Sequence, residues 1–196
     1  GAPLVCDATS DVLSRPWPFE RHAVVFAGAQ KNLGIAGVTL VVVEREFLAT
    51  LRNDLPHMLS LREHAKAGSR LNTPPTFAIF MVGRMAAWIL RHGGVAALEA
   101  RNRRKAARVY GAIDSSDGFY VGTAEKRSRS TLNISFRCAT AALDAAFAAE
   151  AARAGMVGLE GHRSAGGIRA SMYNALPEQA AERLAQFMDE FARRHR

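Results

Sequence analysis

The fold is decided by the stretch Ala23-Val24-Val25-Phe26-Ala27-Gly28-Ala29-Gln30-Lys31-Asn32 and by the apolar run that follows it, Gly37-Val38-Thr39-Leu40-Val41-Val42-Val43. Short runs rich in β-branched residues and bounded by glycine predict strands, and continuous apolar runs predict a sheet buried on both faces. Lys31 would then lie on a tight loop between buried strands. Desolvation there would lower the pKa of its amine and favour the neutral form that a Schiff base requires.

Asp7 is the second candidate, about 24 positions before Lys31, at the end of the apolar run Leu4-Val5-Cys6. Open α/β sheets bind ligands at the carboxyl ends of their strands. A lysine for an imine and an aspartate for a pyridinium nitrogen are the two protein groups that pyridoxal phosphate chemistry needs. The pair alone is weak support, because most lysines and aspartates in loops are solvated surface groups.

The composition predicts a globular protein. The 196 residues are 48% hydrophobic and 22% charged, enough to bury the core of one domain or of two small ones. Cys6 and Cys138 have no metal-ligand spacing, which predicts two reduced thiols and no bound metal. The start of the chain lacks the pattern of a secretion signal, and the apolar runs are shorter than the ~18 residues of a membrane span. We expect a cytoplasmic protein with no membrane partner.

The net charge of +8 raises the possibility of nucleic-acid binding. The excess is concentrated in a helical stretch, whose apolar positions Leu98, Val109 and Ile113 face elsewhere, and in the tail of the chain. The charged residues are Arg101, Arg103, Arg104, Lys105 and Arg108 in the stretch, and Arg193-Arg194-His195-Arg196 in the tail. No aromatic residues are interleaved with the first cluster, as base stacking would require. A solvated helix face is therefore the better interpretation, and the sign of the charge also suits anionic metabolites.

The first half reads as strands followed by helices. We expect strands at residues 4–6, 23–27 and 37–43, a short helix at 44–51, and a long loop or arm at 52–71. The motif Asn72-Thr73-Pro74-Pro75-Thr76 predicts the start of a helix that is capped by Asn72 or Thr73 and runs to residue 90. Gly93-Gly94 should break or bend it.

The second half predicts a small α+β domain. Its expected elements are a helix at residues 95–113, a strand at 132–136, a helix at 140–154, short strands around 161–163 and 168–173, and a helix at 177–194. We therefore expect an α/β protein with two domains, residues 1–99 and residues 100–196. The first recognisable element is already a sheet strand that carries a candidate residue, so the earlier part of a larger α/β domain is expected to be missing.

Four motifs, in order along the chain, resemble the phosphoserine aminotransferase family. They are Cys6-Asp7-Ala8-Thr9-Ser10-Asp11-Val12-Leu13-Ser14-Arg15-Pro16, the lysine segment Gly28-Ala29-Gln30-Lys31-Asn32, the Asn-Thr-Pro-Pro-Thr motif from Asn72, and Gly161-His162-Arg163 with Gly166-Gly167-Ile168-Arg169-Ala170-Ser171-Met172-Tyr173-Asn174-Ala175. The resemblance covers essentially all of this chain but only the latter part of the family's sequence. It implies the latter part of the large domain of a fold-type-I pyridoxal phosphate transferase, residues 1–99 with an arm and an interdomain helix, followed by a small C-terminal α+β domain.

The resemblance implies a role for each cofactor residue. Lys31 would form the imine with pyridoxal phosphate and carry the proton during catalysis. Asp7 would hold the pyridine nitrogen protonated, and Gln30 would donate a hydrogen bond to the cofactor phosphate. Asn72 and Thr73 would reach the phosphate of the neighbouring subunit's cofactor; helix capping is their alternative role.

The resemblance also implies the substrates. Arg169 would bind the α-carboxylate, and His162 with Arg163 would bind the phosphate of phosphoserine across a homodimer with shared sites; a surface basic cluster is the alternative. The implied reaction transfers an amino group between glutamate and 3-phosphohydroxypyruvate, giving O-phospho-L-serine and 2-oxoglutarate in serine biosynthesis, with pyridoxine biosynthesis as a related role.

Two departures from the family leave the expected ligands in place: Thr9 stands where many relatives have serine, and Ile35 where many have proline. The family's ring-stacking aromatic residue, phosphate-binding loop and N-terminal substrate arginine are absent, so an N-terminal portion is expected to be needed.

Two alternative functions stay open. One is another fold-type-I enzyme, such as a serine–glyoxylate aminotransferase or a cysteine desulfurase, although desulfurases have histidine where this chain has Gln30. The other is a non-catalytic fragment or dimerisation module.

Overall fold

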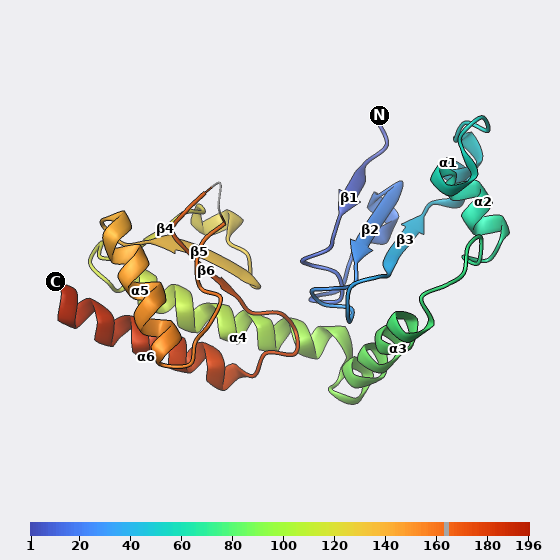
Figure 1. Cartoon of the computed structure of the whole chain (residues 1–196). Helices are drawn as coiled ribbons and strands as arrows, with labels where there is room; N and C mark the ends of the chain where they lie inside the picture. The colour runs from blue at the N-terminus through green and yellow to red at the C-terminus, as the bar shows by residue number, and fades with distance from the viewer. Residues whose placement is uncertain (163–164) are drawn as a thin grey trace. The chain divides into compact units, whose positions relative to one another are not determined.

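The computed structural model describes residues 1–162 and 165–196 (Figure 1). The chain divides into two compact units, Gly1–Val95 and Ala96–Arg196. In the described part of the chain, no helix combines the length and the apolar character that a membrane crossing demands.

The first unit contains a three-stranded sheet of β1 (Val5–Asp7), β2 (Val24–Gly28) and β3 (Thr39–Val43), in that spatial order. β1 pairs in parallel with β2, and β3 runs antiparallel to β2. All three predicted strands are confirmed. Because β1 and β2 are parallel, Asp7 at the end of β1 lies beside Phe26, and the carboxyl ends of both strands meet at one edge of the sheet.

Burial in this sheet differs from the prediction. Six small or aliphatic residues form a compact core beside β2: Ala8, Val12, Val25, Ala27, Ala29 and Leu33. In β3, however, Leu40, Val41 and Val42 remain 39%, 40% and 37% exposed. The prediction of burial on both faces is therefore wrong for β3. The apolar composition sets the preference for a strand, whereas burial requires other segments to cover the strand, and no described segment covers β3 fully.

The segment after β3 is more regular than predicted. The short helix is confirmed as α1 (Arg45–Thr50). The predicted loop at 52–71 instead contains the 3-10 turn η2 (His57–Leu59) and the helix α2 (Leu61–Lys66). The Ser60 side chain caps α2 by accepting a hydrogen bond from the Glu63 amide at 3.3 Å. Serine followed three residues later by glutamate is the sequence signal that would have predicted this helix.

The helix α3 (Thr76–Arg91) begins later than its capping motif suggested. Its N-cap is Pro75, and no side chain caps it, so the prediction that Asn72 or Thr73 caps the helix is wrong. The Asn72 side chain instead donates to the Thr73 carbonyl at 3.2 Å. The predicted break is confirmed, because α3 ends at Arg91 and the next helix begins at Gly94.

The second unit combines helices with a second sheet (Figure 1). Its elements are α4 (Gly94–Asp114), β4 (Val121–Gly122), η3 (Lys126–Ser128), β5 (Asn133–Arg137), α5 (Ala141–Arg153), β6 (Ile168–Ser171) and α6 (Glu178–His195). The strands β4, β5 and β6 lie in that order and are antiparallel throughout. The helices were predicted, whereas β4 was not. Next to the strand predicted around residues 161–163, the described residues form an isolated bridge between Glu160 and Ile168. Arg163 lies outside the described residues.

An aromatic cluster forms the core of this unit. Tyr120, Phe136 and Phe147 meet edge to face with centroid separations of 5.5 to 6.0 Å, and Phe191 of α6 lies 5.1 Å from Phe147. Edge-to-face packing adds about 0.5–1.5 kcal/mol per pair beyond the burial of area. This cluster joins α5, α6 and the central strand β5 into one core.

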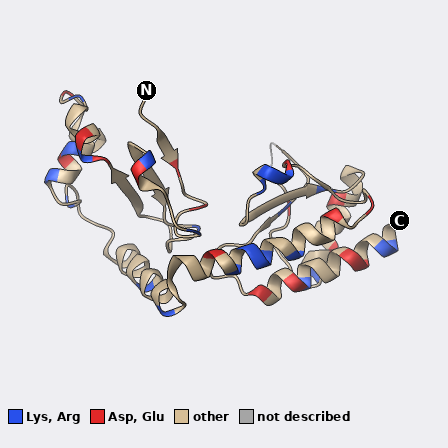
Figure 2. Ribbon diagram, turned by 180° about the vertical axis from the view of Figure 1, so that it is seen from behind, with Lys and Arg blue, Asp and Glu red and all other residues tan. Residues whose placement is uncertain are grey.

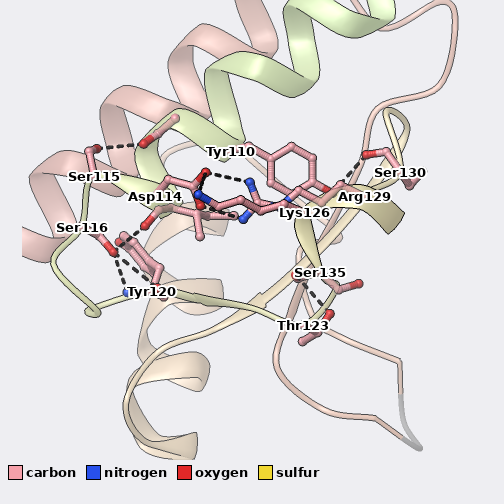
Figure 3. A network of polar contacts seen from close by, with 12 residues as sticks. Tyr110, Asp114, Ser115, Ser116, Tyr120, Thr123, Lys126, Arg129, Ser130 and Ser135 are labelled. Carbon is pink, nitrogen blue, oxygen red and sulfur yellow. Dashed lines mark hydrogen bonds and ion pairs between the residues drawn. The ribbon is translucent and has the colours of Figure 1, made fainter.

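A polar network holds the β4–β5 connection against the end of α4 (Figure 3). Arg129 makes a two-pronged contact with Asp114 at 2.6 and 2.7 Å, and its guanidinium lies 4.3 Å from the centre of the Tyr110 ring. The Tyr110 hydroxyl donates to the Ser130 carbonyl at 3.1 Å. The hydrogen bonds from Arg129 are the main reason that the pKa of Asp114 lies below its ordinary value. The network connects neighbouring elements and therefore has a structural role.

Lys105 contradicts the prediction of a solvated basic face on α4. It is fully buried, and its Nζ donates to the carbonyls of Met172, Tyr173 and Leu176 at 3.0, 2.8 and 3.3 Å. Three carbonyl oxygens match the three N–H groups of an ammonium, which allows the charge to be buried. Nearby, Asn102 donates to the Asn174 side chain at 2.9 Å.

The arginines around Lys105 do form the solvated basic face that the sequence predicts. Figure 2 shows acidic and basic bands interleaved along α4 and α6. Arg104 pairs with Glu178 at 2.7 Å, and Arg103 pairs with Glu99 at 2.7 Å. Their exposed side chains form ordinary surface ion pairs, which contribute little to stability. Leu98, Val109 and Ile113, which were predicted to face away from the basic residues, are buried in the core.

Candidate active site

The candidate site of the first unit lies at the carboxyl edge of β1 and β2 (Figure 1). Asp7 ends β1, and the Thr9 hydroxyl and amide both reach its Oδ1, at 2.5 and 2.9 Å. The Gly28 amide at the end of β2 donates to the same Thr9 hydroxyl at 3.1 Å. Thr9 therefore links the ends of the two strands.

The electrostatics of this edge favour an ionised aspartate. The hydrogen bond from the Thr9 side chain is the largest cause that lowers the pKa of Asp7. The Thr9 amide and the positive charge of Lys31 act in the same direction, and desolvation opposes them. Asp7 is therefore a carboxylate at neutral pH and can accept a further hydrogen bond.

Lys31 lies on the loop after β2, at the same edge. Its Nζ donates to the Ser10 hydroxyl at 2.8 Å, and the neighbouring Asn32 side chain donates to the Ser10 carbonyl at 3.0 Å. Two consecutive residues thus hold the two candidate catalytic side chains. Thr9 donates a hydrogen bond to Asp7, and Ser10 accepts one from Lys31. The expectation of a desolvated lysine is wrong for the described chain, because Lys31 is exposed. The loop after β2 and the hydrogen bonds to Ser10 bring Lys31 to this edge.

Gln30 folds back over the end of β2. A methyl group added at Gly28 would lie 2.5 Å from the Gln30 Oε1, so the end of the Gln30 side chain packs directly on this glycine. The Gln30 side chain is exposed beside the loop and is available to a ligand. Asn72 and Thr73 are also exposed, a few residues before α3. In the described residues, no hydrogen bond joins them to Asp7 or Lys31.

The candidate substrate residues belong to the second unit. Arg169 lies on β6, paired with Ser135 of β5, and its amide donates to the Leu159 carbonyl at 2.8 Å. Its side-chain Nε is buried and has no hydrogen-bond partner within the described residues. His162 is exposed, and its carbonyl accepts from the amides of Ala165 and Gly166 at 2.9 and 2.8 Å.

At the sheet edge of the first unit, the structure adds two residues that the sequence analysis did not predict for the site. They are Thr9, which contacts Asp7, and Ser10, which contacts Lys31. Their signal in the sequence is their position directly after the candidate aspartate at a strand end. Hydroxyl side chains there can bond to neighbouring groups that the turn brings close.

Comparisons with known proteins place the chain in a family. Residues 1–184 match the model of the aminotransferase class-V family. The phosphoserine aminotransferase of Geobacillus kaustophilus is 52% identical over 97% of this chain and 53% of its own length. That of Laribacter hongkongensis is 49% identical over 100% of this chain and 54% of its own length. The chain thus spans about half the length of the curated relatives it matches.

Solved structures agree with this placement. Phosphoserine aminotransferase from Bacillus circulans subsp. alkalophilus superposes with a TM-score of 0.96 at 45% identity, over 100% of this chain and 54% of that one. The pyridoxal phosphate-bound enzyme of Trichomonas vaginalis superposes with a TM-score of 0.89 at 37% identity, over 96% and 54%. The predicted α/β fold of the pyridoxal phosphate transferases is confirmed. The chain belongs to the aminotransferase class-V family.

Proposed function

We propose that this chain contributes the lysine, the aspartate and the substrate arginine of a pyridoxal phosphate-dependent phosphoserine aminotransferase. The reaction transfers an amino group between glutamate and 3-phosphohydroxypyruvate and gives O-phospho-L-serine and 2-oxoglutarate. The observation that carries the proposal is the joint placement of Asp7 and Lys31 at one sheet edge, held by Thr9 and Ser10. The relatives that are 47–52% identical to this chain bear the same name.

The aspartate suits the cofactor's ring. Both hydrogen bonds from Thr9 go to Oδ1 of Asp7, and among the described residues Oδ2 accepts none. An ionised carboxylate with one free oxygen is the group that can hold a proton on a pyridine nitrogen. When bound, pyridoxal phosphate supplies an electron-withdrawing ring and a reactive carbonyl carbon.

The amide and hydroxyl side chains suit the cofactor's phosphate. Gln30 supplies an exposed amide donor next to Lys31. From the resemblance of their motif to the family, we assign Asn72 and Thr73 to the cofactor phosphate in a neighbouring subunit; both side chains are exposed. Neutral donors of this kind bind phosphate without placing another cation beside Lys31.

Lys31 moves the proton in the reaction. With the cofactor bound, its amine would take the proton from the α-carbon of the amino acid and pass it to the carbonyl carbon of the cofactor, and in the reverse direction it would return the proton to the α-carbon of the keto acid. Ser10, which accepts from Nζ at 2.8 Å, orients the amine between these steps. Asp7 would keep a proton on the ring nitrogen, so that the ring could stabilise negative charge at the substrate carbon.

Arg169 is assigned to the α-carboxylate that both substrates share. Its buried Nε lacks a hydrogen-bond partner among the described residues, which suits a two-pronged contact with a carboxylate. His162 and Arg163 are assigned to the substrate phosphate, and Arg163 lies outside the described residues.

We further propose a cytoplasmic homodimer. Both cysteines, Cys6 and Cys138, are free, as expected in a reducing compartment.

Absorption spectroscopy tests cofactor binding. Pyridoxal phosphate is added to the 196-residue chain and, in parallel, to the same chain joined to the N-terminal portion of the Geobacillus kaustophilus relative. We expect a protein-bound visible band that survives gel filtration in the joined protein. A Lys31→Ala variant should lack the band. Failure of both wild-type proteins to retain the cofactor would favour a non-catalytic module.

Substrate preference tests the reaction itself. We expect the joined protein to use phosphoserine at least about a hundred-fold better than serine in kcat/KM, because a phosphate bound by charged side chains contributes several kcal/mol. Equal use of the two amino acids would reject the assignment to phosphoserine and favour another aminotransferase of the same fold.

A further inference from the structure

Thr9 occupies an unusual position between the two strand ends. Its hydroxyl donates to Asp7 Oδ1 at 2.5 Å and accepts from the Gly28 amide at 3.1 Å. Its own amide donates to the same carboxylate oxygen at 2.9 Å. These contacts join the carboxyl ends of β1 and β2 through one side chain.

The hydrogen bonds fix the direction of the hydroxyl. A threonine hydroxyl has one proton to donate and lone pairs that accept. Since the Gly28 amide can only donate, it uses a lone pair and leaves the single proton for Asp7. The β-branched side chain of threonine also restricts rotation about χ1. The hydroxyl proton is therefore held on the Asp7 carboxylate by the backbone of the neighbouring strand.

We propose that Thr9 is the positioning residue for Asp7, with Oδ1 committed to Thr9 so that Oδ2 faces the proton of a pyridine nitrogen. This inference rests on the proposed function, because it assigns Asp7 to the cofactor. Thr9 does not touch the reacting atoms in this assignment; it orients the carboxylate and keeps it ionised.

Two further groups act on the carboxylate besides the Thr9 hydroxyl. The Thr9 backbone amide donates to Oδ1 independently of the side chain, and Lys31, whose Nζ donates to Ser10, adds a positive charge. Removing the Thr9 hydroxyl should therefore weaken the hold on Asp7 without abolishing it. Removing the Ser10 hydroxyl should leave every hydrogen bond to Asp7 in place, which makes Ser10→Ala the matched control.

The first measurement needs no cofactor. The carboxyl carbon of Asp7 is followed by ¹³C NMR through a pH titration of the 196-residue chain, with the resonance identified by its loss in Asp7→Asn. We expect Thr9→Val to raise the pKa of Asp7, whereas Thr9→Ser and Ser10→Ala keep it close to that of the wild type. An unchanged titration in Thr9→Val would overturn the proposal. If that variant fails to fold by circular dichroism, Thr9→Ala replaces it.

The second measurement connects Thr9 to cofactor binding in the joined protein described above. Titration with pyridoxal phosphate should give a dissociation constant about ten-fold higher for Thr9→Val, equivalent to one charge-assisted hydrogen bond. Thr9→Ser should restore binding to within about two-fold. If Thr9→Ser weakens cofactor binding as severely as Thr9→Val does, the methyl group of Thr9 matters and its hydroxyl does not. That result would overturn the proposal.

The two measurements separate the inference from the proposed function. If the wild-type protein binds no pyridoxal phosphate, the proposed function fails, while the NMR titration still decides whether Thr9 controls Asp7. If the wild type binds the cofactor and Thr9→Val binds it equally well, the proposed function stands and the positioning role of Thr9 is rejected.

Discussion

At the scale of single residues, hydrogen-bond geometry rather than burial distinguishes the candidate catalytic groups. Lys31 is exposed and contacts Ser10 at 2.8 Å, and Asp7 is exposed and contacts Thr9 at 2.5 Å. Neither side chain supports a hydrophobic core. Their replacement should therefore affect chemistry far more than stability.

Lys31→Ala should abolish turnover in the joined protein and leave its unfolding temperature nearly unchanged. The variant loses both the bond to the cofactor and the proton carrier, and general acid–base catalysis alone contributes about 10²–10⁴-fold. Steady-state assays and thermal melts measure the two effects. Lys66→Ala, at an exposed position of α2, is the control that should keep full activity. Near-normal turnover of Lys31→Ala would show that another lysine carries the reaction.

Arg169→Ala and Arg163→Ala should separate the two half-reactions. The α-carboxylate is common to all substrates, whereas the phosphate is present on only one pair. We expect Arg169→Ala to slow the reactions with glutamate and with phosphoserine alike, by about ten- to a hundred-fold, equivalent to ~1.5–3 kcal/mol for a charge-assisted hydrogen bond. Arg163→Ala should slow only the reaction with phosphoserine. Single-turnover mixing with each amino acid measures the rates, and equal effects of Arg163→Ala on both would contradict the assignment.

At the scale of elements, a buried lysine connects α4 to the segment that follows β6. Burial is the main cause that lowers the pKa of Lys105 to about 8; the charge of Arg101 adds to it and that of Glu178 opposes it. The three carbonyls that accept from Nζ lie 67 to 71 positions later in the chain. One titrating group thus joins the middle of α4 to the segment after β6.

This lysine predicts a pH-dependent stability. The ordinary pKa of lysine is about 10.4, so between pH 8 and pH 10 the unfolded chain binds more protons than the folded chain, and the contribution of Lys105 to stability rises with pH. The contribution grows by up to about 3 kcal/mol across this window. We expect the free energy of unfolding of the wild type, measured relative to Lys105→Met, to increase from pH 7.5 to pH 9.5.

Measuring the free energy of unfolding relative to Lys105→Met cancels the effects of the other titrating groups. Burial raises the pKa of Cys138 to about 12 and also raises the pKa of Tyr120, and both groups oppose the trend at high pH. These groups are present in both proteins, so their effects cancel in the difference. Lys126→Met, at an exposed lysine, should show no such trend. A difference that stays flat or falls with pH would contradict the assignment to Lys105.

At the scale of the whole molecule, the two units differ in how well they are packed. The second unit has a continuous aromatic core around Phe136, Phe147 and Phe191, whereas the first has a small core and exposed apolar side chains on β3. Since hydrophobic burial is the dominant favourable contribution to folding, the second unit should be the more stable one.

Separate unfolding of the units can be observed with natural probes. Both tryptophans, Trp17 and Trp88, lie in the first unit, and all three tyrosines, Tyr110, Tyr120 and Tyr173, lie in the second. In a urea titration of the 196-residue chain, tryptophan fluorescence should report a lower midpoint than the near-ultraviolet circular dichroism of the tyrosines. Coincident midpoints would indicate a single cooperative transition and contradict the prediction.

The sequence by itself determined the features that depend on neighbouring residues. Apolar runs and glycines, whose effects are local, determine the strands β1, β2 and β3 and the break at Gly93-Gly94. They also place Asp7 at the end of a strand and Lys31 on the loop after one. The family motifs are local in the same sense. The capping signal of Ser60 and Glu63, which predicts the start of α2, is also local.

Only the tertiary structure decided what depends on distant segments. Lys105 has the sequence pattern of a surface lysine and is buried because carbonyls 67 to 71 positions away accept hydrogen bonds from its Nζ. Thr9 reaches the Gly28 amide, 19 positions away, because β1 and β2 pair in parallel. β3 has the composition of a buried strand and is exposed because no described segment covers it fully. Burial and long-range hydrogen bonds are properties of the packed chain, which local sequence patterns do not contain.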